Sequence, residues 1–131
     1  RDKAESSTGR ITVSFPRISG TLALATSDER IKDKVSIVDE SECIERLHSL
    51  ELWNYTMKKE MSTNPEVATY PKRGFMAQQA NSVDQAYALP PQSDEDYWGI
   101  DDRAIIADLV GAIRVLQKEI NILKGVDNEP E

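Results

Sequence analysis

The residues that form disulfides or bind metals are scarce in this chain, and so are aromatics. Aromatic side chains make up 6% of the 131 residues, and there is one cysteine and one histidine. A lone cysteine cannot form an internal disulfide, and no Cys/His cluster offers metal ligands. We therefore expect no metal and no other cofactor. Cys43 is expected to be a buried apolar residue in a reducing compartment, and His48 to have a surface or packing role.

Long apolar runs and excess positive charge are also missing. The apolar stretches are far shorter than the roughly 20 residues that span a bilayer, and no signal-peptide pattern opens the chain. The net charge of −7 repels phosphate backbones and anionic membranes. We therefore expect no nucleic-acid and no membrane partner. Because residues 1–3 lack a methionine, we interpret the chain as a piece of a longer protein.

Most catalytic motifs are missing too. There is no glycine-rich phosphate loop and no nucleophile elbow, and the clustered acids lie in polar surroundings. What remains is Ser27 with Lys32 in the charged segment 27–34. A lysine can take a serine proton only when its own ammonium is easily deprotonated, by desolvation or by nearby positive charge such as Arg30 and Lys34. By composition alone, a solvated linker is the favoured interpretation of this segment.

Short strands and helices are predicted before the last quarter of the chain. Alternating apolar residues predict two strands without nearby partners at 11–15 and 21–24. Asp39 or Ser41 is expected to cap a helix that reaches about residue 50. The later predicted elements are a strand at 53–57, a loop at 62–65, a strand at 73–77, a helix at 78–88 and an acidic loop at 92–99. The fold class is therefore predicted to be α+β.

The clearest predicted element is a long C-terminal helix. It is expected to begin at Asp101 or Asp102 and to end near Lys124, with Gly125 as its stop. Its apolar residues recur at spacings of 3 and 4, as an a/d seam of Ile106, Leu109, Ile113, Leu116, Ile120 and Leu123. The flanks are polar, so we expect the helix to pack against copies of itself rather than only on its own domain. Isoleucine at a with leucine at d favours dimers, so the pattern alone does not specify three strands.

The charged segment opens an ordered series of motifs. Residues 27–35, SDERIKDKV, closely resemble the S-D-x-R-x-K-x-x-I/V start of the peptidase S74 family, the chaperone domain of endosialidases, phage tail spikes and neck appendages. The later motifs follow in that family's order: a helix and aromatic strand at 44–55, G-F-x-A-Q at 74–78, leucine-proline at 89–90 and a closing helix at 101–124. Gln79 departs from the pattern, since many relatives carry glutamate there.

The resemblance implies a mechanism and an assembly. The domain is expected to form a homotrimer that closes in a short coiled coil, and to guide folding of the β-helical fibre domain upstream in the same chain. It is then expected to cut the bond between Thr26 and Ser27, with Ser27 as nucleophile and Lys32 as general base. An alternative is a non-catalytic trimerisation module in which both residues belong to a linker. A protease acting in trans is disfavoured, because the chain is too small for a substrate groove as well as an oligomer interface.

The resemblance also sets the expected domain organisation. Residues 1–26 are expected to be the end of the upstream β-rich fibre body, and residues 27–131 the autoprocessing chaperone. Asp28, Glu29 and Arg30 belong to the motif and are expected to orient the catalytic pair. The chaperone is expected to act in the host cytoplasm during phage assembly, as part of the precursor of a virion tail component, and to be absent from the mature virion.

Overall fold

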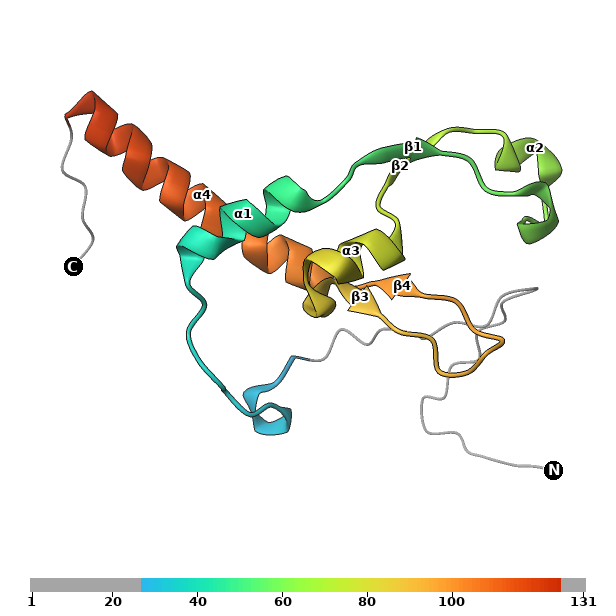
Figure 1. The fold of residues 1–131 in the computed structure, drawn as a ribbon, viewed down its shortest axis with the longest axis horizontal. Coiled ribbons are helices and arrows are strands. Elements are labelled where there is room, and N and C mark those ends of the chain that lie inside the picture. The colour runs from blue at the N-terminus through green and yellow to red at the C-terminus, as the bar shows by residue number, and fades with distance from the viewer. Residues whose placement is uncertain (1–26, 126–131) are drawn as a thin grey trace.

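A computed structural model describes residues 27–125 of the protein. The strands expected at 11–15 and 21–24, Thr26 and the acidic tail after Gly125 lie outside these residues. The elements in chain order are η1 (Glu29–Ile31), α1 (Glu40–Ser49), β1 (Trp53–Tyr55), η2 (Lys59–Met61), α2 (Pro65–Ala68), β2 (Lys72–Gly74), α3 (Ala77–Val83), η3 (Gln85–Tyr87), β3 (Ala88–Leu89), β4 (Gly99–Ile100) and α4 (Asp102–Lys124). The predicted mixture of helices and short strands with a long closing helix is confirmed (Figure 1).

The long helix α4 has the ends that its sequence predicts. The Asp101 side chain accepts a hydrogen bond from the backbone N–H of Arg103 and so caps the first turn. Gly125 follows the last turn with φ of 74°, a left-handed conformation that glycine adopts without a steric penalty. These two signals fix the length of the helix at 23 residues.

Helix α1 packs along the middle of α4, as Figure 1 shows. Asp39, one of the two predicted caps, accepts from the backbone N–H of Ser41 and starts the helix. Cys43 is buried as predicted, and it lies directly against Gly111 of α4. A Cβ atom at Gly111 would lie 2.5 Å from the Cys43 sulfur, so this close approach of the two helices requires glycine.

The apolar core is small and lies between α1, α3, η3 and the first half of α4. Its buried members are Ala80, Tyr87 and Ile105, and the partly buried residues packed on them are Leu47, Leu50, Phe75, Val83, Ile100 and Ala104. Leu47 and Leu50, at the end of α1, thus face the core, whereas His48 is exposed. Two antiparallel pairs complete the fold: β1 with β2, and β3 with β4. In Figure 1 the β1–β2 pair and α2 extend away from the core as an arm.

The helix predicted at 78–88 is wrong over its second half. Helix α3 ends at Val83 because the backbone of Asp84 is extended, with φ of −160° and ψ of 128°. The Asp84 carboxylate then accepts from the backbone N–H of Ala86 and starts the separate turn η3. Ala88 and Leu89 leave that turn to pair with β4. The break turns Tyr87 into the core, which a continuous helix need not do.

The arm also differs from prediction in detail. The strands predicted at 53–57 and 73–77 are shorter than expected, since β1 ends at Tyr55 and β2 at Gly74. The predicted loop at 62–65 ends one residue early, because Pro65 opens α2 at a position that tolerates the missing N–H of proline. Single-turn elements such as η2 and α2 carry too little periodicity to be predicted from sequence.

Candidate functional site

Ser27 and Lys32, the predicted nucleophile and base, lie in contact. The Lys32 ammonium donates a hydrogen bond to the Ser27 hydroxyl, with 2.5 Å between Nζ and Oγ. The turn η1 brings them together: the backbone N–H of Ile31 donates to the carbonyl of Asp28, and that of Lys32 to the carbonyl of Glu29. Two side chains five positions apart do not lie next to each other on a regular helix. The short turn η1 instead brings Lys32 back to Ser27.

Both members of the pair are exposed in the single chain. A serine hydroxyl becomes a strong nucleophile only when a base removes its proton, and a lysine can act as that base only when its environment favours the neutral amine. Burial is the usual cause of such a shift. The two side chains are therefore in hydrogen-bond contact, but the described part of the chain does not shield them from water.

The other motif residues have unequal roles at this turn. Asp28 and Arg30 are bonded to each other, with 2.9 Å between an Asp28 oxygen and a terminal guanidinium nitrogen. Arg30 therefore directs its charge at Asp28, and the expectation that it acts on Lys32 finds no support in these contacts. Bonding to Arg30 also holds the pKa of the Asp28 carboxyl below its usual range. Glu29 forms no side-chain hydrogen bond within the part of the chain that the structure describes.

A second candidate surface is the apolar seam on α4. Helix α1 covers a different face of α4, where Ile105, Gly111 and Ala112 are buried. All six seam residues are exposed: Ile106, Leu109, Ile113, Leu116, Ile120 and Leu123. The prediction that the seam does not pack on its own domain therefore agrees with the structure. Exposed apolar residues aligned along three or more turns are typical of a helix–helix interface.

Comparison with known proteins decides the family. Residues 27–89 match the peptidase S74 family, described as chaperone of endosialidase. This part of the chain belongs to that family. The match begins at Ser27 itself and includes η1, α1, both strands of the arm and β3, whereas α4 follows it. No curated protein matches the sequence. The family description supports a chaperone role, and the word peptidase in the family name suggests a domain that cuts its own chain.

A buried polar cluster joins α1 and η3, which lie inside the matched region, to α4, which follows it. The Arg46 guanidinium donates twice to the Asp108 carboxylate, at 2.8 Å and 2.7 Å. The Tyr87 hydroxyl donates to the same carboxylate, and Glu42 lies 3.5 Å from the other terminal nitrogen of Arg46. Sequence reasoning missed this cluster. The available hint was Asp108, which interrupts the stripe of small and apolar residues that faces α1.

The ionisation of the cluster follows from these contacts. Bonding to Arg46 lowers the pKa of Asp108 from 3.8 to about 2, even though burial opposes the shift. Burial raises the pKa of Tyr87, and the hydrogen bond to Asp108 adds to this effect. Burial also raises the pKa of the Cys43 thiol. Near neutral pH the ion pair is therefore charged, the tyrosine and the thiol are neutral, and the contacts of the cluster stabilise the packing of α1 on α4.

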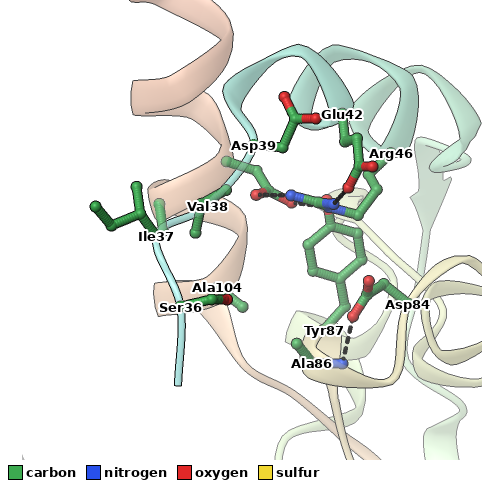
Figure 2. A pocket seen from close by; sticks show the side chains of 12 residues that line it. Ser36, Ile37, Val38, Asp39, Glu42, Arg46, Asp84, Ala86, Tyr87 and Ala104 are labelled. Atoms are coloured by element: carbon green, nitrogen blue, oxygen red, sulfur yellow. Dashed lines mark hydrogen bonds and ion pairs between the residues drawn. The ribbon is translucent and has the colours of Figure 1, made fainter. Parts of the chain in front are cut away.

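A hollow of about 490 Å³ lies beside the cluster, between the segment that leads into α1 and the first half of α4 (Figure 2). Its lining residues are Ser36, Ile37, Val38, Asp39, Glu42, Arg46, Asp84, Ala86, Tyr87, Ala104, Ala107 and Asp108. Asp39 and Asp84 are engaged in caps, and Arg46 and Asp108 in the ion pair. These four side chains at the hollow are thus occupied by structural contacts.

Neither a metal-binding cluster nor a membrane-spanning helix occurs among the described residues. Between residues 27 and 125 no three His, Cys, Asp or Glu side chains gather in a way that could hold a metal ion. In the same part of the chain, no helix is both long and apolar enough to cross a membrane. The Ser27–Lys32 contact, at the start of the matched region, and the α4 seam, which follows it, therefore remain the candidate functional features.

Proposed function

We propose that this chain is an intramolecular chaperone that assembles as a homotrimer and then releases itself by serine autoproteolysis between Thr26 and Ser27. The observation that carries the proposal is the contact of Lys32 Nζ with Ser27 Oγ at the first residue of the family match. Residues 1–26 are then the end of the fibre body upstream, and residues 27–131 the chaperone. The fibre is a phage tail spike or tail fibre assembled in the host cytoplasm, and the released chaperone is absent from the mature virion.

The proposed chemistry needs only the two side chains and water. Lys32 Nζ takes the hydroxyl proton as Ser27 Oγ attacks the carbonyl carbon of Thr26. The bond from that carbon to the Ser27 nitrogen breaks, the nitrogen takes up a proton, and an ester links Thr26 to Ser27 Oγ. Water hydrolyses the ester, which frees the carboxylate of Thr26 and leaves Ser27 as a new amino terminus. The reaction happens once per chain, so it releases the domain rather than turning over a substrate.

Assembly of three chains explains why a fibre benefits from such a domain. Pairing three chains along a β-rich fibre involves contacts that are distant in sequence, so folding is slow and prone to aggregation. A C-terminal trimer raises the effective concentration of the three chains for one another. Once the chaperone is removed, the fibre is kinetically trapped in its folded state, because the template for refolding has left.

Two exposed apolar surfaces support self-association. The first is the seam on α4, whose residues Ile113 and Leu123 are 63% and 86% exposed. The second is the extended segment before α1, where Val35 and Ile37 are 94% and 97% exposed. Burial of such residues is favourable by about 25 cal/mol for each Å². In this proposal the same association covers the exposed Ser27–Lys32 pair and so couples cleavage to completed assembly.

The decisive experiment is to express the chain and separate it on a denaturing gel over time. The unmodified chain is expected to yield two fragments, and the larger one to begin at Ser27 by amino-terminal sequencing. Ser27→Ala and Lys32→Ala are each expected to leave the chain intact while light scattering still shows a trimer. An intact unmodified chain that is trimeric would favour the alternative, a non-catalytic trimerisation module.

The role of the seam is tested in the same assay. Ile113→Asp places a charge at the middle of the proposed interface and is expected to shift the trimer toward monomer and to slow cleavage. Lys118→Asp introduces the same side chain off the seam, on an exposed position of the same helix, and is expected to change neither. If Ile113→Asp leaves the trimer intact, the seam is not the interface.

A further inference from the structure

The turn that carries the catalytic pair is closed by one carboxylate. Asp28 precedes η1, and its Oδ1 accepts from the backbone N–H of Arg30 at 2.8 Å. This bond caps the turn in the way that an aspartate caps a helix. A three-residue turn has few backbone hydrogen bonds of its own, so side-chain contacts decide whether it persists in water. The direction in which the chain leaves the turn toward Lys32 therefore depends on Asp28.

The side chain of Arg30 bonds to the same carboxylate. Its Nε lies 3.1 Å and 3.2 Å from the two oxygens of Asp28, and a terminal nitrogen lies 2.9 Å from Oδ2. A planar guanidinium that bonds both oxygens restricts the carboxylate more than a single contact does. Together with the backbone bond, Arg30 holds Asp28 through four donor–acceptor contacts in a segment where every residue is exposed.

We propose that Asp28 and Arg30 are positioning residues for self-cleavage, which lock η1 so that Lys32 Nζ stays on Ser27 Oγ. The inference rests on the proposed function, since it concerns the same reaction. Lysine has a long side chain with many rotamers, and holding it at one atom costs conformational entropy. A turn that is already formed between Ser27 and Lys32 reduces this entropy cost, because it starts the lysine side chain close to the serine. Among the described contacts, the side chains of Asp28 and Arg30 bond to each other and not to Ser27 Oγ or Lys32 Nζ, so both act on this pair through the shape of the turn.

A different role for Arg30 makes a different prediction. If Arg30 acted by its positive charge alone, Arg30→Lys would preserve cleavage, because lysine carries the same charge. If Arg30 instead acts as a fork, meaning that its planar guanidinium bonds both oxygens of Asp28 at once, Arg30→Lys loses these simultaneous contacts and slows cleavage. The contacts in the structure favour the fork, since the guanidinium faces Asp28.

The test measures first-order rates of self-cleavage of the full chain on denaturing gels. Asp28→Ala removes the cap and the fork, and is expected to slow cleavage by between about tenfold and a hundredfold, the usual penalty for a misplaced catalytic group. Asp28→Asn keeps an oxygen for the backbone N–H of Arg30 and is expected to recover part of the lost rate. The matched control is Asp33→Asn. Asp33 follows Lys32, and its carboxylate has no partner among the described residues. The Asp33→Asn chain is therefore expected to cleave itself at the unmodified rate.

The outcomes separate this inference from the proposed function. If the unmodified chain is cut but Asp28→Ala is cut equally fast, the positioning role is wrong and the proposed function stands. If the unmodified chain is never cut, the proposed function is wrong and the positioning role fails with it. Light scattering on every variant shows whether the trimer survives. If Asp28→Ala does not assemble, a slower rate of assembled Arg30→Lys supports the inference, and an unchanged rate overturns it.

Discussion

The chain contains two aspartate–arginine pairs with the same fork geometry in opposite surroundings. Asp28 and Arg30 are neighbours in sequence, and their side chains are 40% and 86% exposed. Asp108 and Arg46 are 62 residues apart, and their side chains are 9% and 22% exposed. An exposed pair is screened by water and contributes little to stability, whereas breaking a buried pair leaves an unpaired charge in the interior. The first pair therefore shapes a turn, and the second holds two helices together.

The largest expected effect comes from breaking the buried pair. Asp108→Ala leaves the Arg46 guanidinium and the Tyr87 hydroxyl without their shared acceptor, and is expected to lower the free energy of unfolding by about 3–5 kcal/mol. Urea unfolding in the Ser27→Ala background, at one protein concentration, measures it. The same measurement on Asp28→Ala is expected to show the unmodified stability. Equal losses in the two variants would remove the distinction between the pairs.

The difference between the pairs also explains what sequence could predict. The ends of α4, set by Asp101 and Gly125, are local signals and were predicted. Ser27 and Lys32 were singled out together from the sequence, and the structure adds the turn that brings them into contact. The bond between Arg46 and Asp108 was not predicted, because it depends on how α1 and α4 cross, and no local pattern encodes that crossing. The break at Asp84 was missed for a related reason: it is stabilised by the burial of Tyr87, a tertiary effect.

The next effect in size is a dependence of stability on pH. Asp108 has a folded pKa of about 2 against an ordinary value of 3.8. Since the folded value is the lower one, its contribution is fully present above about pH 5 and is lost as the pH falls from about 4 toward 2. The shift corresponds to about 2 kcal/mol.

This contribution can be separated from those of the exposed carboxylates. The measurement is thermal unfolding between pH 2 and 6 in about 1 M salt. Salt at this concentration weakens exposed ion pairs, because the screening length is about 3 Å. Asp108→Asn is expected to show a shallower dependence of Tm on pH than the unmodified side chain. Asp28→Asn is expected to keep the unmodified slope under these conditions. If Asp28→Asn flattens the slope as much as Asp108→Asn, the buried pair is not the origin of the acid sensitivity.

The smallest effect concerns the third member of the buried cluster. Tyr87→Phe removes one donor to Asp108 but leaves both bonds from Arg46, so the carboxylate keeps its main partner. We expect a loss of about 1 kcal/mol in the free energy of unfolding, the usual value for a single hydrogen bond. Tyr97→Phe is the matched control, since Tyr97 is 58% exposed and should lose nothing measurable. A loss near that of Asp108→Ala would mean that Tyr87, rather than Arg46, is the principal partner of the buried carboxylate.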